Sequence, residues 1–333
     1  MFIVANYSLA VIFCFITMLC WGSWGNTQKM AAKSWRYELF YWDYVIGMVL
    51  FALFIAFTMG SCGDQGRPFL EDIAQVSAKN IGGIVLGGVI FNASNILLSA
   101  STSIAGMAVA FPLGVGISMV LGTIVNYLGA PKGDPAMLFI GVALIVVAIV
   151  CNGVASGRIQ KDKKAGANKG IILAVLAGTL MAFFYRFVAA AMDLDNFAAP
   201  AAGKATPYTA IVIFSLGVLV SNFVFNTIVM RKPFVGEPVS YNAYFKGNMK
   251  THLVGVLGGC IWCLGTAFSY IASGKAGAAV SYALGQGAPM IAALWGVFIW
   301  KEFKGASKSV YALLGVMFCF FLAGLAFIIV SGN

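Results

Sequence analysis

Two ionisable side chains lie deep inside apolar stretches of this 333-residue chain, where a charge is costly and therefore marks a functional site. Asp43 lies about two turns into the apolar segment 37–60. Because burial disfavours the charged carboxylate, Asp43 could load and unload a proton, as a proton-coupling group must. It could also form a structural ion pair or reach water from the helix end. Arg186, in the segment 170–192, could hold a carbonyl or carboxylate of a solute, neutralise Asp43, or reach a water-filled vestibule.

Amide side chains form the second candidate group, because they offer both donors and acceptors to a neutral polar solute. Those at membrane depth are Asn92, Asn95, Asn126, Asn222, Asn226 and Gln286. Their alternative role is hydrogen bonding between helices, worth only ~1 kcal/mol each in lipid. We expect Asn95 and Gln286 to bind solute, because they lie in or beside a duplicated motif. Asn126 is a third candidate, although helix–helix bonding is the stronger interpretation for it and for the remaining amides.

Aromatic residues form the third group. Trp21 and Trp24 are three residues apart and share one helix face, where they could stack a heterocycle or a sugar ring. They also lie near the expected inner interface, where Trp is common anyway. Tyr282 lies one turn before Gln286 on the same helix face and is a neighbouring candidate. His252, the single histidine, could relay protons or simply lie at the interface.

Patterns for catalysis and cofactor binding are missing from the sequence. No G-x-x-x-x-G-K-[ST] occurs, and neither G-x-G opens a helix after a strand. Cys260 and Cys263 form a C-x-x-C inside an apolar stretch without a matching pair, so we interpret them as small packing residues. With one histidine and no Ser/His/Asp constellation, we expect no enzyme, no ATP-driven pump, and neither a cofactor nor a metal site.

The composition is that of a membrane protein, since 61% of the residues are apolar and 10% are charged, whereas soluble domains are about one quarter charged. The net charge of +10 comes from basic residues scattered through short loops, which favours a charge bias across a bilayer over a nucleic-acid partner. The first 25 residues lack a basic n-region and a cleavage site, so we expect a retained helix.

At about 20 apolar residues per crossing, the sequence predicts ten spans, at 7–29, 37–60, 79–101, 104–128, 135–154, 170–192, 207–230, 251–273, 276–300 and 307–330.

Lysine and arginine predict the orientation of these spans. With the 155–169 loop inside, the outer loops hold Arg67, Lys79, Lys132, Lys204 and Lys275. The inner loops hold fifteen basic residues, namely Lys29, Lys33, Arg36, Arg158, Lys161, Lys163, Lys164, Lys169, Arg231, Lys232, Lys246, Lys250, Lys301, Lys304 and Lys308. This bias places both termini outside a cell (inner) membrane that the chain crosses many times.

Two motifs occur twice, and both pairs are separated by 171 residues. Residues 85–91 (VLGGVIF) match 256–262 (VLGGCIW). Residues 105–116 (AGMAVAFPLGVG) match 276–287 (AGAAVSYALGQG) at seven of twelve positions, and Phe111 corresponds to Tyr282. The chain is therefore one duplicated unit.

The duplication predicts the domain organisation. We expect a first five-helix repeat at 1–157, a basic cytoplasmic linker at 158–169 and a second five-helix repeat at 170–333. Because five is odd, the second repeat must enter the membrane from the opposite side, which makes the fold an all-α inverted repeat. Gly and Pro residues weaken spans four and nine at corresponding places, a pattern typical of a transport site between repeats.

Five runs resemble the ureide permeases, which are ten-span carriers of the drug/metabolite transporter superfamily related to glucose/ribose porters and rhamnose–proton symporters. They are WGSWGNTQK (21–29), YWDY (41–44), GGVIFNASN (87–95), GTIVNY (122–127) and QGAPMIAALWGVFIWKEF (286–303). The likeness extends in order over nearly the whole chain. By this resemblance, the family motif positions are Trp21, Asp43, Asn95, Asn126, Gln286, Pro289 and Glu302.

The resemblance implies a carrier of allantoin, uracil and related compounds, or of a sugar, driven by protons. The sequence departs from the family pattern in its short central loop at 155–169, in Arg186, and in Ala283 where an acidic residue is expected. We therefore predict a secondary transporter that takes up a small neutral polar solute, a ureide, nucleobase or sugar such as ribose, by proton-coupled alternating access. A drug or metabolite exporter of the same superfamily is the alternative, and a non-transporting membrane enzyme or scaffold is a third hypothesis.

Overall fold

The computed structural model describes residues 1–159 and 167–333, and this part of the chain is helical, without strands. Ten helices or helix groups are long and apolar enough to cross a membrane, which confirms the all-α, ten-span prediction. The helices are α1 (Tyr7–Ala31), α2 (Tyr37–Phe57), α3 (Phe69–Gln75), α4 (Ala78–Ala105), α5 (Met107–Gly129), α6 (Pro135–Ile159), α7 (Ala167–Ala191), α8 (Pro207–Arg231), α9 (Tyr241–Phe245), α10 (Met249–Ala276), α11 (Ala278–Gly285), α12 (Ala288–Leu294), the π-helix η1 (Trp295–Ile299) and α13 (Lys308–Ser331).

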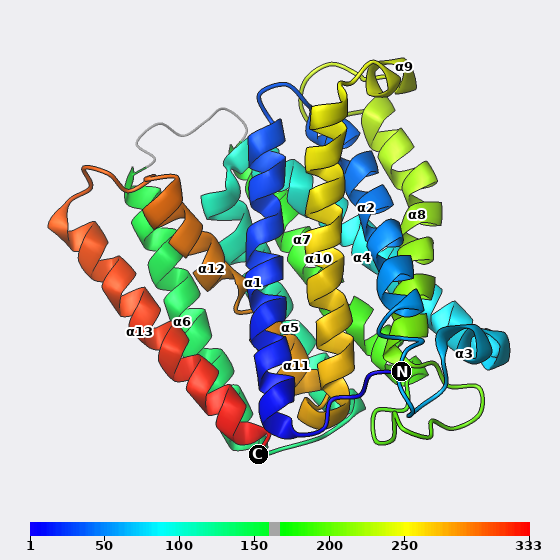
Figure 1. Ribbon diagram of the computed structural model, residues 1–333. Helices are drawn as coiled ribbons and strands as arrows, with labels where there is room; N and C mark the ends of the chain where they lie inside the picture. Colours follow the sequence, from blue (N-terminus) through cyan, green and yellow to red (C-terminus); the bar gives the residue numbers. More distant parts are fainter. Residues whose placement is uncertain (160–166) are drawn as a thin grey trace.

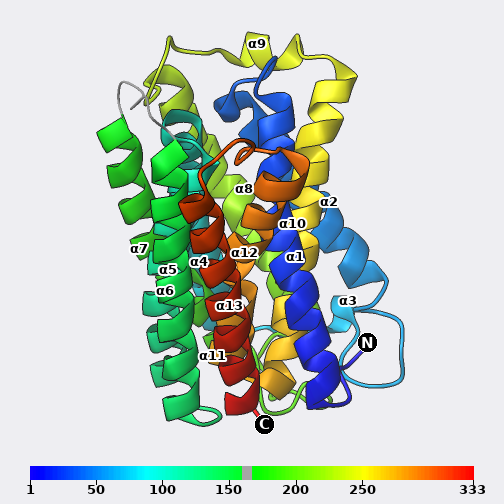
Figure 2. The same ribbon diagram turned by 90° about the vertical axis from the view of Figure 1, so that its left-hand side faces the viewer.

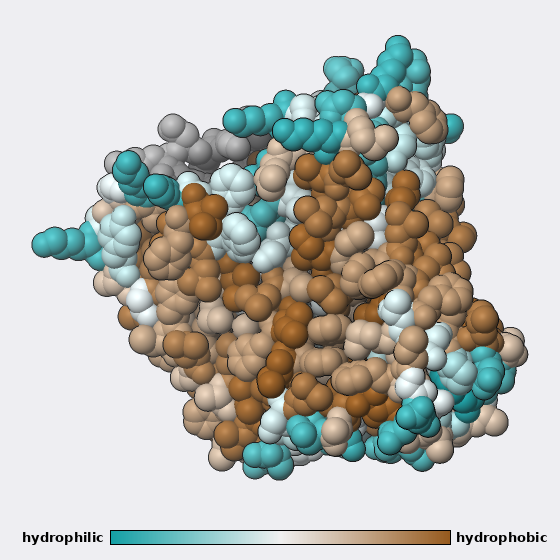
Figure 3. Space-filling view, viewed as in Figure 1, coloured by the Kyte–Doolittle hydropathy of each residue, from teal (hydrophilic) through white to brown (hydrophobic). Residues whose placement is uncertain are grey.

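The short helices α3 and α9 mark the two ends of the bundle, which we call the α3 end and the α9 end (Figures 1 and 2). Both chain termini lie at the α3 end. An apolar belt separates the two more polar ends (Figure 3), as the bilayer requires. Of the predicted linker 158–169, residues 160–166, with Lys161, Lys163 and Lys164, lie outside the described residues.

The duplicated segments have the same local structure. α4 and α10 each contain 28 residues. The Ser77 side chain caps α4 by accepting from the backbone N–H of Asn80, and Asn248 caps α10 in the same way. At their other ends, Gly106 has φ 86° and ψ 156°, and Gly277 has φ 81° and ψ 157°. These positive φ values favour glycine and turn each helix directly into the next.

Glycine pairs at matching positions decide how α4 and α10 pack. A Cβ atom at Gly88 of α4 would lie 2.5 Å from the carbonyl oxygen of Phe214 on α8. A Cβ atom at Gly259 of α10 would lie 1.9 Å from the carbonyl oxygen of Tyr44 on α2. The missing side chains let these backbones touch, which is how helices associate tightly in lipid. Accordingly, α4 packs on α7 and α8, while α10 packs on α1 and α2.

The ninth span is interrupted, whereas the corresponding α5 is continuous. α11 ends at Gly285, and α12 begins beside Pro289 and runs into η1. In α5, Pro112 lies within an unbroken helix. The sequence predicted weakness in both spans, and each has two glycines near one proline. Pro112 precedes the glycines inside α5, whereas Pro289 follows them in the first turn of α12, a position where proline starts a new helix. The structure therefore places the break in the second copy.

The glycine contacts give a stability prediction. Gly88→Ala should lower the thermal stability of the detergent-solubilised protein, by ~1–3 kcal/mol, because the added methyl group overlaps the backbone of α8. Gly82→Ala on the same helix is the control. A Cβ there meets nothing within 4 Å, so this variant should unfold at an unchanged or higher temperature. Equal effects of the two changes would contradict the packing argument.

Candidate functional site

A small cavity of about 30 Å³ lies where α1, α4, α5, α7, α10 and α12 meet. Four of the predicted solute-binding residues line it together, which are Trp21, Trp24, Asn95 and Gln286. They come from three separate spans. Sequence spacing alone could not show that they converge, because that depends on how the helices pack.

Aromatic rings form most of the cavity wall. Phe91 and Trp262, the equivalent last residues of the two VLGG motifs, meet with ring centroids 4.2 Å apart. The Trp21 and Trp262 rings are stacked at 6.1 Å, and Phe111 lies 6.0 Å from Trp24. Phe184 is a further wall residue. Sequence reasoning missed Phe91, Phe111, Phe184 and Trp262 as site residues, although the ends of the two copies of the motif were a usable signal for Phe91 and Trp262.

The cavity has few polar groups, and most of them already have a hydrogen-bond partner. Asn95 donates through Nδ2 to the Tyr41 hydroxyl at 3.3 Å, and Gln286 donates through Nε2 to Ser118 Oγ at 3.4 Å. Among the described residues, no hydrogen bond ends on Asn95 Oδ1 or Gln286 Oε1. The Trp21 indole N–H is already used, because it donates to Thr266 Oγ1 at 3.0 Å. The cavity therefore offers two amide oxygens to a solute with N–H or O–H donors.

Tyr282 lies directly behind this cavity and does not line it. Its hydroxyl lies 2.5 Å from Ser118 Oγ and donates towards the carbonyl oxygens of Ser118, at 3.1 Å, and Met181, at 3.3 Å. Because Ser118 also accepts from Gln286, the tyrosine positions one of the cavity amides. Its direct contact with solute stays a prediction.

Asn126 and Arg186 lie away from the cavity, towards the α3 end. Asn126 donates within its own helix to the Gly122 carbonyl at 2.8 Å. The Arg186 guanidinium packs on Gly129, the last residue of α5, where a Cβ would lie 1.8 Å from Nε. The structure does not group these two residues with the other site candidates. The alternative in which Arg186 neutralises Asp43 is wrong, because Asp43 has other partners near the opposite end.

Asp43 is held by three donors near the α9 end. Its Oδ1 lies 2.6 Å from the Tyr244 hydroxyl and 2.7 Å from His252 Nδ1, and its Oδ2 accepts from Trp35 Nε1 at 3.0 Å. The carboxyl group is buried, while the His252 side chain is 21% exposed. Burial, followed by the hydrogen bond to Asp43, raises the pKa of Tyr244 above its usual range, so its hydroxyl remains a donor at any physiological pH. The cluster joins α2 to α9 and α10.

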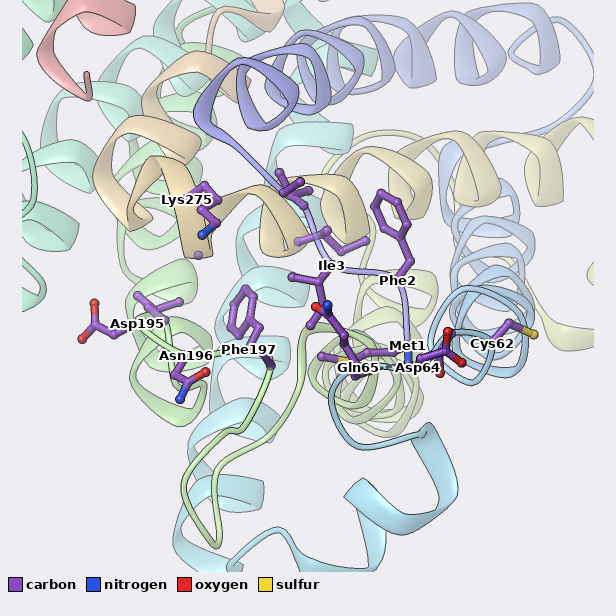
Figure 4. A pocket seen from close by; sticks show the side chains of 17 residues that line it. Met1, Phe2, Ile3, Cys62, Asp64, Gln65, Asp195, Asn196, Phe197 and Lys275 are labelled. Carbon is purple, nitrogen blue, oxygen red and sulfur yellow. Dashed lines mark hydrogen bonds between the residues drawn. The ribbon is translucent and has the colours of Figure 1, made fainter.

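A surface hollow of about 640 Å³ lies at the α3 end of the bundle. It is lined by the N-terminal segment and by residues such as Gln65, Phe197 and Lys275 (Figure 4). It shares no lining residue with the central cavity. Between the two, the buried hydroxyls of Tyr185, Ser269 and Ser281 form a hydrogen-bonded cluster with distances of 3.0–3.4 Å.

The ten-span helical bundle is that of a multi-pass membrane protein, and sequence comparisons specify which kind. The sequence model of the family described as Ureide permease matches residues 40–169 and 159–331, so the chain belongs to the ureide permease family. Permeases are transporters and not enzymes.

The chain aligns with curated relatives over long stretches. It is 22% identical to Ureide permease 1 of Arabidopsis thaliana, over 100% of this chain and 99% of that protein. It is 24% identical to the Glucose uptake protein GlcU of Bacillus subtilis (strain 168), over 65% and 68% of the two chains. A crystal structure with 14% identity superposes with a TM-score of 0.62 and covers 97% of this chain and 96% of its own, which shows a shared fold.

The Tyr282 contacts predict a measurable loss of stability. Tyr282→Phe removes a buried donor and leaves Ser118 and Met181 without their partner, which should cost ~1–3 kcal/mol in thermal unfolding. Tyr270→Phe is the control, because among the described residues the buried Tyr270 hydroxyl makes no hydrogen bond. The control should be neutral or stabilising, and a loss as large as that of Tyr282→Phe would refute the role given to the Tyr282 hydroxyl.

Proposed function

We propose that this ureide permease family member is a secondary transporter that binds a small neutral polar solute in the central cavity and exposes it to one side of the membrane at a time. The observation that carries the proposal is the convergence of Asn95, Gln286 and the rings of Phe91 and Trp262 at the place where the duplicated helices meet. A transport site of this kind lies near the midplane, between repeats.

Alternating access is supported by the relation between the two halves. α4 and α10 are equivalent in sequence, yet α4 runs towards the α9 end and α10 runs away from it (Figure 1). The packing partners are exchanged in the same manner, since α4 contacts α7 and α8 whereas α10 contacts α1 and α2. We infer an inverted repeat with the halves 1–157 and 170–333. Rocking such halves about a fixed site exposes it alternately.

The size of the cavity fits a contracted state of such a cycle. About 30 Å³ has room for roughly two water molecules, whereas ligand pockets typically measure ~300–1,000 Å³. A solute therefore requires the helices to separate. The interruption of the ninth span, beside the cavity residue Gln286, gives a place where this movement can occur.

The wall chemistry favours a flat ring with neighbouring C=O and N–H groups over a sugar. Aromatic faces stack on planar heterocycles, and two amides suffice to pair such a ring. A sugar carries more hydroxyls than Asn95 and Gln286 can satisfy, and each unpaired polar group is costly when buried. We therefore place a ureide or nucleobase first and a sugar such as ribose second. The names of the relatives include both a ureide permease and a glucose uptake protein.

Proton coupling is assigned to Asp43, acting at a distance from the solute. Asp43 does not line the cavity, and the groups that face it are Trp35, Tyr244 and His252, with Gly255 beside its Cβ. A proton on Asp43 would weaken its hydrogen bonds with these donors and so loosen α2 from α10. The partly exposed His252 provides a route to water. With the α9 end in the cytoplasm, as the basic loops predict, the proton would be released inside and the solute would be imported.

Uptake into proteoliposomes with a pH gradient tests the proposed function. We expect accumulation of allantoin, uracil or a related ring compound, with ribose as the comparison solute. Gln286→Leu should abolish this uptake without unfolding the protein, because it keeps the bulk and removes the amide from the cavity. Asn92→Leu is a control for loss of a buried amide elsewhere, since Asn92 bonds Ser221 and does not line the cavity. No gradient-dependent uptake of any of these solutes would overturn the substrate claim.

Asp43→Asn separates coupling from binding. The variant should lose pH-driven accumulation but retain solute exchange across the membrane, because the cavity is untouched while the titrating group is gone. The measurement compares accumulation and counterflow in the same vesicles. If both activities survive, Asp43 is not the coupling residue.

A further inference from the structure

A second hollow lies at the α9 end, close to the central cavity. It measures about 560 Å³ and is lined by polar residues that include Gln28, Lys29, Thr102 and Glu302. Its rim is joined by the ion pair between Lys29 and Glu302. This hollow is large enough for a small solute. It shares no lining residue with the central cavity, so something separates the two spaces.

A small space of about 20 Å³ lies between them and traces a route. It shares Met107, Ser156, Glu302 and Phe303 with the hollow. With the central cavity it shares a single lining residue, Phe111. Asn152 lines this space as well, so with Ser156 and Glu302 the route includes three polar side chains on the hollow side of the phenyl ring. Phe111 therefore lies between the cavity and the small space on the side of the α9 end.

The ring of Phe111 is held by apolar contacts. Gly25 of α1 lies opposite it, where a Cβ would be 2.9 Å from Phe111 Cζ and 3.1 Å from Met107 Sδ. Trp24 lies beside it. A phenyl ring makes no hydrogen bond that must be replaced when it moves, and Met107 has a flexible side chain.

The duplicated positions on the other side of the cavity carry hydroxyl groups instead. Tyr282 corresponds to Phe111, Ser281 to Ala110, and Ser269 to Leu98. The three hydroxyls are buried. Ser269 and Ser281 bond to each other and to Tyr185 of α7, and Tyr282 bonds to Ser118 of α5 and Met181 of α7. Opening the cavity towards the α3 end must break these bonds, whereas Phe111, the lining residue shared with the route to the α9 end, is held by apolar side chains. The two equivalent positions therefore differ in the kind of contact that holds them.

We propose that Phe111 is the gate between the solute cavity and the α9 end, and that its counterpart Tyr282 belongs to a hydrogen-bonded closure on the α3 side. The proposal rests on the transport function argued above, in that it names the residue that opens one of the two access routes. By this proposal, the cavity becomes accessible from the α9 end when the Phe111 ring moves, while hydrogen bonds keep the α3 side closed.

The test measures access to the cavity with a thiol and needs no transported solute. Val115→Cys places a thiol in the cavity wall, in a chain whose exposed cysteines are replaced by Cys62→Ser and Cys319→Ser. Membrane vesicles of both orientations are treated with a charged, membrane-impermeant methanethiosulfonate reagent. A separate chain with Lys33→Cys, at an exposed position between α1 and α2, identifies the vesicles that present the α9 end.

Phe111→Ala should accelerate labelling of the cavity thiol by about tenfold or more, and only in vesicles that present the α9 end. Phe111→Leu, which keeps part of the packing, should give an intermediate rate and serves if the alanine variant does not fold. Phe184→Ala is the matched control, because it removes an equal ring from the cavity wall without touching the small space on the route. It should leave the rate unchanged.

Unchanged labelling after both Phe111 substitutions, equal acceleration by Phe184→Ala, or acceleration from the α3 end would each overturn the proposal. The uptake assay stands apart from this one. A chain that moves none of the tested solutes refutes the substrate claim, while the labelling rates still decide whether Phe111 controls access.

Discussion

Direct backbone contact between helices is the constraint on which this structure depends. In α4, Gly87 faces α7 and Gly88 touches the backbone of α8, while in α10 Gly258 faces α1 and α2 and Gly259 touches the backbone of α2. These contacts fix the depth at which each VLGG motif lies, and therefore bring the residues that end the two motifs, Phe91 and Trp262, to 4.2 Å from each other. In a bilayer, apolar side chains gain nothing by leaving lipid for a helix interface, so close approach through small residues takes the place of a hydrophobic drive. The cavity follows from this packing.

The two copies of the duplicated segment have kept their packing residues and changed their polar ones. The glycines, the helix caps and the aromatic residues recur, whereas Val115 corresponds to Gln286, and Phe111 to Tyr282. Packing is needed equally in both halves, because both helices meet a partner of the other half. Polar side chains for binding solute are not needed in both halves, since one cavity serves both halves. The differences between the copies therefore indicate which side of the cavity binds solute and which side opens to admit it.

Much of this architecture could be predicted from the sequence, for identifiable reasons. Span positions follow from the length of apolar runs, and the family from motifs spread over the chain. Trp21, Trp24, Asn95 and Gln286 could be selected because polar or aromatic residues beside a duplicated motif are expected at its centre. Asn126 and Arg186 could not be placed, because burial in a span says nothing about which way a side chain points. Two partners of Asp43 could not be predicted either, since Tyr244 and His252 are about 200 residues away in sequence.

An experimental structure of the protein with its transported solute bound tests the account most directly. The account predicts a widened central cavity with the solute between the rings of Trp24 and Trp262, within hydrogen-bonding distance of Asn95 and Gln286. Solute bound elsewhere, with the central cavity as small as it is here, would contradict it.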